Sequence, residues 1–341
     1  MSDRRISGFK PTGPLQLGNY VGAIRPVVEG QDRPTTVFVA DLHALTVPHD
    51  PRRLRELSLQ VAGLLLAAGV DPARAVLYRQ SDLPAHAELH YLLECVASYG
   101  EAHRMIQFKE KGGGSGTRLS LLTYPVLMAA DILLHDIAEV PVGRDQRQHV
   151  ELTRDLALRF NERHGPVFTV PRATHPAVAA RLADLADPTA KMGKTNTSAN
   201  GVLFLLDPPD VLRRKVMRAV TDMGGEVAYD PDTKPGVSNL LEILAVATGG
   251  DPVRIARDYP NYGTLKSGVA DAVIALLEPL QRRYYALTED DIEEALALGA
   301  ERAAERADAT VRRVREAMGL TSGRRAPAGT RATPETAPAP R

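Results

Sequence analysis

The sequence predicts an α/β protein with a parallel sheet and crossover helices in its first half and helices alone in its second. The first half alternates short β-rich runs with helical patterns, which is typical of a parallel sheet. After Asp187-Pro188, apart from an apolar run at 202–206, the segments have helical spacing. The length of 341 residues favours about two domains. We expect domains over 1–186 and 187–320, and a disordered tail over 321–341.

Strands are predicted where β-branched and aromatic residues gather between turn residues, at 5–9, 35–40, 75–78 and 138–142. Helices are predicted where apolar residues recur every three or four positions. One begins after Asp50-Pro51, an N-cap followed by a proline suited to the first turn. The predicted helices begin near 19 and cover about 51–68, 84–98, 101–111, 119–134, 146–164, 209–220, 238–247, 269–285 and 290–318, with a glycine-rich loop at 112–116.

The composition excludes several classes of protein. No apolar run reaches the roughly 18 residues that a membrane span needs. Cys95 is the only cysteine, which excludes an internal disulfide and a cysteine-based metal cluster. We therefore expect a cytoplasmic protein without membrane contact. Lys plus Arg and Asp plus Glu both number 42, so a polyanionic partner must be bound by a local patch of charge.

The segment 7–20 predicts a phosphate-binding turn. It joins a strand, a glycine- and proline-rich turn and a helix start, where backbone N–H groups attract phosphate. Gly18 permits close approach, Gln16 and Asn19 add hydrogen bonds, and Lys10 adds a positive charge. Many strand–helix turns look similar and bind nothing, so this segment alone leaves both alternatives open.

A second loop, 187–195, carries two lysines three positions apart. Its Gly-Lys-Thr end is similar to a P-loop, but that motif needs a glycine where the chain has Pro188, so a P-loop is excluded. Lys191 and Lys194 remain as compact charges that can reach a transferring phosphoryl group. Only eight of the 42 basic residues are lysines, and five of the eight lie in three short segments: Lys10, Lys109, Lys111, Lys191 and Lys194.

The apolar helix predicted at 119–134 contains an isolated carboxylate. Tyr124, Met128 and Asp131 recur at helical spacing and share one face. An aspartate among apolar residues is costly to bury unless it is paired. A substrate N–H group between apolar walls would pair it, and so would a neighbouring loop or an arginine.

Together these segments resemble a known family. The turn Leu15–Asn19 and the loop Lys191–Thr195, about 175 residues later, resemble the paired HIGH and KMSKS signatures of class I aminoacyl-tRNA synthetases. With 41–46, 105–111 and 122–154 included, the chain from Ile6 to Gly319 closely resembles the bacterial tryptophanyl-tRNA synthetases. The resemblance implies a Rossmann-like catalytic domain, a helical anticodon-side domain and a homodimer.

The resemblance also implies roles for single residues. The family's matching aspartate receives the indole N–H of tryptophan, which implies that role for Asp131. The other implied tryptophan-binding residues are Phe9, His43, Tyr124, Met128, Val140, Val142 and Gln146. The implied ATP-binding residues are Gln16, Gly18, Asn19, Gly143, Asp145, Lys191, Met192, Lys194 and Thr195. Catalysis would rest on Lys10, Lys111, Lys191 and Lys194, which with Mg²⁺ stabilise phosphate charge; no protein metal site is expected.

The implied activity is a two-step ligation of L-tryptophan to tRNA(Trp). The amino-acid carboxylate attacks the α-phosphorus of Mg-ATP, giving tryptophanyl-adenylate and pyrophosphate. A ribose hydroxyl of the terminal tRNA adenosine then attacks the adenylate. Positioning and charge stabilisation suffice for this chemistry, so no side-chain nucleophile is needed. A tyrosyl-type ligase, and a paralogue that binds tryptophan and ATP as a regulator, are the alternatives.

Several positions depart from the family pattern and suggest a divergent, auxiliary form. Lys10 stands where a glutamine is usual, Gln16 replaces a histidine or threonine, and Arg144 replaces an acidic residue. Gly193 and Thr195 replace two serines. The signature lysines and Asp131 are retained, so we expect an active enzyme.

Two other patterns have simpler interpretations. His86 and His90 flank Glu88, but a zinc protease needs the acid directly after the first histidine, so a metal site is not expected. Cys95 is expected to pack inside an apolar helix. The arginines of the last predicted helix alternate with acids and fit a tRNA-facing surface and a salt-bridged solvated face equally well: Arg302, Arg306, Arg312, Arg313 and Arg315.

Replacing Lys194 by alanine tests the lysine loop. We expect ATP–pyrophosphate exchange to fall by about 100-fold or more, because one charge that stabilises the transferring phosphate is lost. Tryptophan affinity, measured by equilibrium dialysis without ATP, should stay unchanged. Equal losses of exchange and of tryptophan affinity would contradict this role.

Overall fold

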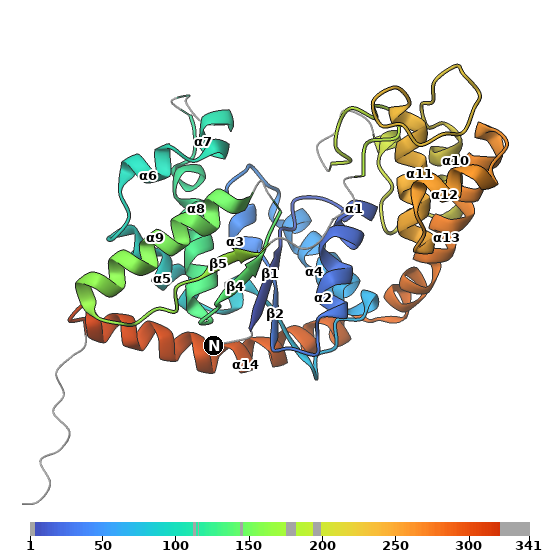
Figure 1. Ribbon diagram of the computed structural model, residues 1–341. Coiled ribbons are helices and arrows are strands. Elements are labelled where there is room, and N and C mark those ends of the chain that lie inside the picture. Colours follow the sequence, from blue (N-terminus) through green and yellow to red (C-terminus); the bar gives the residue numbers. More distant parts are fainter. Residues whose placement is uncertain are drawn as a thin grey trace, which may run out of the picture.

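The computed structural model describes residues 4–111, 114, 116–143, 146–174, 182–193 and 199–320 (Figure 1). The predicted tail at 321–341 and most of the glycine-rich loop at 112–116 lie outside these residues. Asp145, Lys194 and Thr195 lie outside them too, as does the side chain of Lys111.

Parallel strands form the centre of the first lobe. Three of them pair in the order β1-β2-β3, with Arg5 opposite Thr35 and Thr35 opposite Ala75. Two more form a second parallel pair, in which β4 lies beside β1 (Figure 1). The resulting order β3-β2-β1-β4-β5 follows that of a doubly wound fold, which confirms the predicted fold class. The strands are β1 (Arg5–Phe9), β2 (Thr35–Val39), β3 (Ala75–Arg79), β4 (Glu139–Pro141) and β5 (Arg172–Thr174).

Side chains of β2 alternate between two apolar cores. Val37 and Val39 enter one core with α4 (Pro51–Ala68), and Phe38 enters the other with α5 (Ala85–Glu94) and α8 (Leu119–Leu134). Helices therefore cover both faces of the sheet, as a parallel sheet requires.

The remaining helices of the first lobe are short, apart from α9. The segment predicted as one helix at 101–111 is two helices, because the first ends at Arg104 and the buried Met105 turns into the core. Cys95, expected to be packed inside, is exposed at the end of α5. These elements are α1 (Leu17–Asn19), the π-helical η1 (Tyr20–Ile24), α2 (Arg25–Glu29), α3 (Asp41–Ala44), the 3₁₀ turn η2 (Gln80–Asp82), α6 (Tyr99–His103), α7 (Ile106–Lys111) and α9 (Arg147–His164).

The second lobe is helical, and it shares a core with the first. Leu64 of α4 and Leu240 of α11 belong to the same apolar cluster. The apolar run at 202–206 makes one antiparallel bridge, from Phe204 to Gln16, and adds no strand to the sheet. The longest helix of this lobe starts before the predicted residue 269, because Asn261 caps it. The elements are η4 (Ala199–Gly201), α10 (Pro209–Met217), α11 (Pro235–Thr248), α12 (Pro252–Ile255), η5 (Ala256–Asp258) and α13 (Tyr262–Ala286).

The last helix, α14 (Glu289–Ala317), returns along the first lobe and packs against β3, α4, α5 and α8 (Figure 1). Close contact with β3 requires glycine at 299, because a Cβ atom there would lie 1.7 Å from the Leu77 carbonyl oxygen. Arg313 pairs with Asp136 at 2.9 Å. Arginines of this helix thus bind acids of the first lobe, an arrangement that neither sequence interpretation included.

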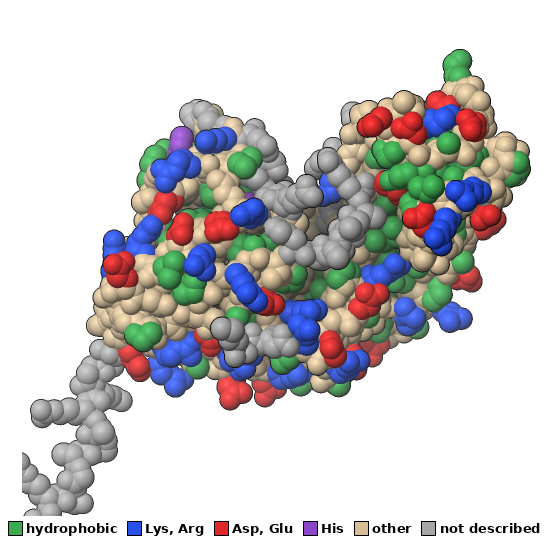
Figure 2. Space-filling view, in the orientation of Figure 1, with side chains coloured by type: hydrophobic (Ala, Val, Ile, Leu, Met, Phe, Trp, Pro, Cys, Tyr) green, Lys and Arg blue, Asp and Glu red, His purple; other side chains and the backbone are tan. Residues whose placement is uncertain are grey.

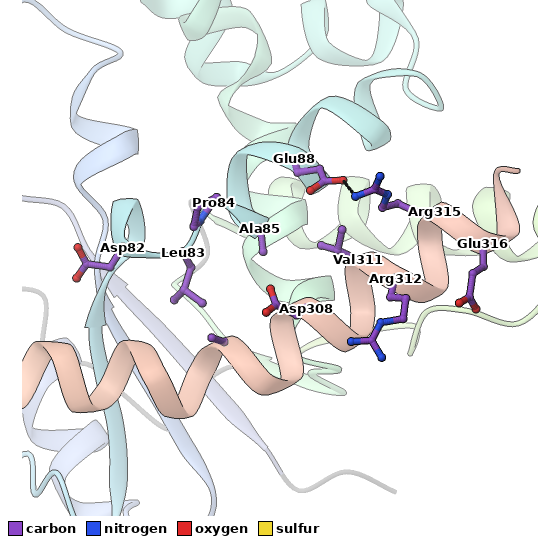
Figure 3. A pocket seen from close by; sticks show the side chains of 11 residues that line it. Asp82, Leu83, Pro84, Ala85, Glu88, Asp308, Val311, Arg312, Arg315 and Glu316 are labelled. Atoms are coloured by element: carbon purple, nitrogen blue, oxygen red, sulfur yellow. Dashed lines mark ion pairs between the residues drawn. The ribbon is translucent and has the colours of Figure 1, made fainter. Parts of the chain in front are cut away.

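The surface carries scattered charge. Figure 2 shows basic and acidic side chains distributed over both lobes, with a hollowed surface between the lobes. A separate hollow of about 690 Å³ lies between α5 and α14, crossed by the ion pair of Arg315 with Glu88 at 3.5 Å (Figure 3). None of the residues predicted to bind substrate lines that hollow. Across the described ranges, no helix is long and apolar enough to span a membrane.

The close packing of α14 on β3 predicts that alanine at position 299 destabilises the fold. Replacing Gly299 by alanine in an ordinary helix would stabilise it by about 1 kcal/mol. Here the added methyl group overlaps the Leu77 carbonyl, so we expect the free energy of unfolding to fall by about 1–3 kcal/mol. Urea unfolding measures the change, and a stabilised variant would contradict the packing.

Candidate active site

The predicted site residues follow the carboxyl ends of the parallel strands. Phe9 ends β1, His43 lies in α3 directly after β2, and Gly143 follows β4. Open α/β folds bind their ligands at this edge, where the strand order changes direction. Here that point lies between β1 and β4.

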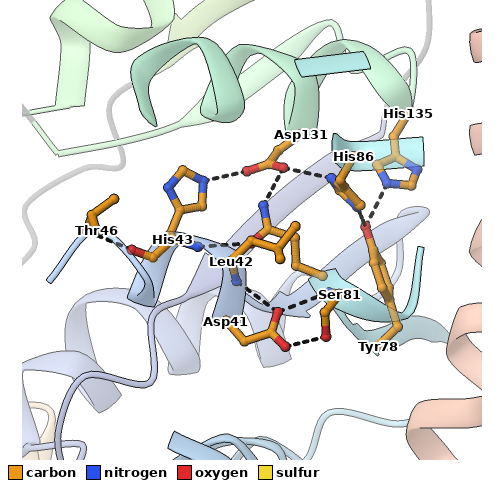
Figure 4. A network of polar contacts seen from close by, with 10 residues as sticks. Asp41, Leu42, His43, Thr46, Tyr78, Ser81, His86, Asp131 and His135 are labelled. Atoms are coloured by element: carbon orange, nitrogen blue, oxygen red, sulfur yellow. Dashed lines mark hydrogen bonds and ion pairs between the residues drawn. The ribbon is translucent and has the colours of Figure 1, made fainter. Parts of the chain in front are cut away.

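Asp131 of α8 is buried at this edge and is bound by three side chains (Figure 4). His43 Nε2 lies 2.8 Å from its Oδ2, and His86 Nδ1 lies 2.7 Å from its Oδ1. Gln80 Nε2 donates to the same Oδ1 at 2.7 Å. The pairing that the sequence requires for a buried aspartate is thus made by two histidines and an amide.

These contacts keep Asp131 ionised. Burial favours the neutral acid, but the hydrogen bonds from His43 and His86 hold the pKa of Asp131 well below its usual range. A carboxylate offers about four acceptor positions, and the three side chains occupy three of them. The carboxylate therefore retains capacity for one more N–H donor, on Oδ2.

The network continues away from the site through two further buried side chains. The Tyr78 hydroxyl lies 2.9 Å from His86 Nε2 and 2.8 Å from His135 Nε2. Burial and the nearby Asp131 charge raise the pKa of Tyr78 well above its usual value. Burial, with the neighbouring His86, lowers the pKa of His135 to about 3. Tyr78 and His135 are thus neutral at physiological pH and hold His86 against Asp131.

The other residues predicted to bind the amino acid belong to the apolar core around α8 or lie beside His43. Val140 is buried, and Met128 and Val142 are partly buried against the same core as α8. The Tyr124 ring lies edge-on to His43, with 6.2 Å between ring centroids, and its hydroxyl is 2.8 Å from His149 Nε2. Tyr124 thus contacts a partner of Asp131, and Met128, Val140 and Val142 belong to the apolar core into which α8 packs.

The predicted phosphate turn is held by Gln16, which is buried at the start of α1. Its side-chain Oε1 accepts from the Gly18 N–H. The backbone N–H of Gln16 donates to Asn19 Oδ1 at 3.1 Å. Its Nε2 donates to the Met192 carbonyl at 3.0 Å. The two signature segments therefore contact each other, and the Gly18 N–H, one of the backbone groups of the predicted phosphate turn, is bound to Gln16.

The lysines differ in how they are placed. Lys10 Nζ donates to Thr46 Oγ1 at 2.9 Å, and Thr46 Oγ1 donates to the His43 carbonyl at 2.8 Å. Lys191 is exposed, and its backbone pairs with Ala183. Lys10 is thereby connected to the Asp131 network through α3.

The turn between β4 and α9 is closed by the Gln146 N–H, which donates to the Gly143 carbonyl at 3.0 Å. Both residues were predicted to bind substrate; Gly143 lies shortly after the end of β4, and Gln146 is the N-cap of α9.

Sequence reasoning missed Gln80, His86, Tyr78 and His135. His86 was considered only as part of a zinc pattern, and no group of three or more His, Cys, Asp and Glu able to hold a metal lies within the described ranges. A signal for its burial was present, because His86, Leu89 and Leu93 share one face of α5. For Gln80 the signal was its position directly after β3, at the carboxyl edge of the sheet where open α/β folds bind ligands.

Comparison with known proteins shows the family of the chain. The profile of tRNA synthetases class I (W and Y) matches residues 3–278, and the chain belongs to that family. The chain is 54% identical over 326 residues to tryptophan–tRNA ligase 1 of Streptomyces coelicolor, with 93% of this chain and 97% of that protein aligned. The resemblance to bacterial tryptophanyl-tRNA synthetases is thereby confirmed.

Solved structures of bacterial tryptophanyl-tRNA synthetases have the same fold. The tryptophanyl-tRNA synthetase of Mycoplasma pneumoniae aligns with a TM-score of 0.86 and 35% identity over 93% of this chain and 98% of that one. The Campylobacter jejuni tryptophanyl-tRNA synthetase complexed with ADP and tryptophan aligns with a TM-score of 0.81 and 31% identity, over 93% and 100%.

The buried His135 predicts an acid-sensitive fold. Between pH 6.5 and pH 3 the unfolded chain binds a proton at this histidine and the folded chain does not. Stability therefore rises with pH across this window and is lost as the pH falls. His135→Gln keeps a donor for Tyr78 and should reduce this slope by about 1.4 kcal/mol per pH unit. Urea unfolding at pH 4, 5 and 6 measures it, and identical slopes would contradict a neutral buried His135.

Proposed function

We propose that the chain is a tryptophan–tRNA ligase that activates L-tryptophan with ATP and transfers it to tRNA(Trp). One observation carries the proposal. Asp131 is ionised, buried against apolar side chains and left with capacity for one further donor. The named relatives support the same function.

Amino-acid selection rests on Asp131 in this proposal. The indole N–H donates to Oδ2, and Met128, Val140 and Val142 contact the ring. Phenylalanine fits the apolar walls but leaves a buried carboxylate short of a donor, so it is rejected. Tyr124 and Gln146 hold the amino group, and Phe9 and His43 complete the pocket.

Adenylate formation requires the α-phosphate of ATP to lie beside the tryptophan carboxylate. In this proposal the turn formed by Gln16, Gly18 and Asn19 is part of the phosphate-binding site, and Gln16 holds the turn in place through its bonds to Gly18 and Met192. Gly143, Asp145, Met192 and Thr195 contact the nucleotide. Lys10, Lys111, Lys191 and Lys194 stabilise the charge of the pyrophosphate as it leaves. The chain supplies orientation and charge and forms no covalent bond to substrate.

Mg²⁺ is part of the proposal through ATP. This ion generally binds substrate phosphates with few protein carboxylates, and when bound it neutralises phosphate charge. Enzymes of this family use ATP. The lysines named above would contact the same phosphate groups.

The second step, the partners and the domains complete the proposal. The helical lobe, within the region 187–320, receives the anticodon side of tRNA(Trp), and the first lobe receives its acceptor end. A homodimer is supported by four large side chains exposed on neighbouring helices α5–α8, namely Tyr91, Tyr99, Ile106 and Leu119. A cytoplasmic location agrees with the single cysteine.

Replacing Asp131 by alanine or asparagine tests the selection. We expect the ratio of kcat/KM for tryptophan to kcat/KM for phenylalanine, in ATP–pyrophosphate exchange, to fall by about 100-fold, because the ionised acceptor is gone. The ratio is independent of how much of the variant folds. Asp41→Asn is the matched control, since Asp41 binds Ser81 and Leu42 instead, and its ratio should stay as in the wild type. An unchanged ratio in the Asp131 variants would overturn the proposal.

Exchange with each of the twenty amino acids separates this function from a tyrosyl-type ligase, which would favour tyrosine. Acylation of tRNA(Trp) separates it from a regulatory paralogue, which would activate or bind tryptophan without charging tRNA.

A further inference from the structure

We propose that Asn239, on helix α11 of the helical lobe, is a positioning residue for the loop that carries Lys191. This inference rests on the proposed function. In this inference, the hairpin 182–192 connects the helical lobe to the phosphate-binding turn of the first lobe.

The residues before Lys191 form a short hairpin closed by its own backbone. The Asp184 N–H donates to the Ala190 carbonyl at 2.9 Å, and the Met192 N–H donates to the Leu182 carbonyl at 3.0 Å. Ala183 and Lys191 face each other as an antiparallel bridge. Movement of Ala183 therefore moves the backbone of Lys191.

Asn239 binds Ala183 with both ends of its side-chain amide. Its Oδ1 accepts from the Ala183 N–H at 2.8 Å, and its Nδ2 donates to the Ala183 carbonyl at 3.0 Å. The Asn239 side chain is buried, with 4% of its surface exposed. Two bonds to the N–H and C=O of one residue determine both the distance and the rotation of that residue relative to α11.

Gln16 binds the other side of the same hairpin. Its Nε2 donates to the Met192 carbonyl while its Oε1 accepts from the Gly18 N–H. Hydrogen bonds thus join α11 to Ala183, the neighbouring Leu182 to Met192, and Met192 to Gln16 in the turn after β1, and Lys191 lies between two of these bonded residues. Two amide side chains, one from each lobe, hold the hairpin.

This arrangement separates Asn239 from amino-acid binding. Its contacts go to the hairpin, whereas the Asp131 network comes from α3, α5, α8 and the segment after β3. Loss of the Asn239 amide should therefore displace Lys191 from the phosphates without changing the tryptophan pocket. Loss of a residue that merely stabilises α11 would instead reduce pyrophosphate exchange and tryptophan binding together, in proportion to the unfolded fraction.

The neighbouring Ser238 provides a matched control. It is buried in the same helix, but its hydroxyl oxygen accepts from the Asp230 N–H at 2.9 Å, away from the hairpin's Ala183. We compare Asn239→Ala, Asn239→Asp and Ser238→Ala in the full-length chain. Asn239→Asp keeps the size and the acceptor but places a carboxylate oxygen against the Ala183 carbonyl.

The first measurement is ATP–pyrophosphate exchange with tryptophan. Both Asn239 variants should lose about 10- to 100-fold in kcat/KM for ATP, as expected when a group near the reacting phosphate is displaced. Their tryptophan Kd, measured by equilibrium dialysis without ATP, should equal that of Ser238→Ala. Exchange in the Asn239 variants equal to that in Ser238→Ala, or a matching loss of tryptophan affinity, would overturn the inference.

The second measurement does not depend on activity. Trypsin cleaves the bond between Lys191 and Met192, and the hydrogen bond from the Met192 N–H to the Leu182 carbonyl protects that bond while the hairpin is held. Mass spectrometry should show faster cleavage after Lys191 in both Asn239 variants than in Ser238→Ala, under conditions where all variants keep their far-ultraviolet circular dichroism. Equal cleavage rates would contradict the inference.

The two levels of proposal fail differently. Wild-type protein that exchanges pyrophosphate with no amino acid would remove the proposed function and this inference with it. Wild-type protein that exchanges with tryptophan, together with Asn239 variants that match Ser238→Ala, would remove this inference alone.

Discussion

The buried carboxylate of Asp131 is the interaction on which the site depends. Its partners come from three separate segments, with His43 after β2, Gln80 after β3 and His86 at the start of α5. One charge thus holds several pieces of the sheet's carboxyl edge in a fixed relation. An uncompensated charge at this depth would be strongly destabilising, so the network must form whenever the chain folds. A preformed acceptor costs no reorganisation when a substrate N–H arrives.

In the proposed function, different parts of the chain select the amino acid and bind phosphate. Selection would belong to the buried Asp131 network within the first lobe. The phosphate-binding segments belong to the boundary between lobes, where Gln16 and Asn239 hold a single hairpin by backbone contacts. Because the lobes share one apolar core, this boundary is a continuous packed region in which a shift of α11 reaches Lys191. In that proposal, a shift of the helical lobe would move Lys191 while leaving the Asp131 network unchanged.

Much of the fold was predictable from the sequence, because hydrophobic periodicity and capping residues act locally. The parallel strands and the long helices α4, α8, α9 and α14 follow from such patterns. The three-residue strand β5 has no period to detect, and the start of α13 depends on the Asn261 cap. In the site, the sequence indicated that Asp131 needs a partner. It did not indicate that His86 and Gln80 provide it, because that contact forms only when α5, α8 and the end of β3 meet.

The most direct test of the account compares tryptophan with β-(3-benzothienyl)alanine, which has nearly the same shape but carries sulfur in place of the indole N–H. The measurement is kcat/KM for each amino acid in wild-type ATP–pyrophosphate exchange. If the ionised Asp131 selects the substrate through its N–H, the analogue should be poorer by about 100-fold or more. Equal values for the two amino acids would show that shape alone selects the substrate and would contradict the account.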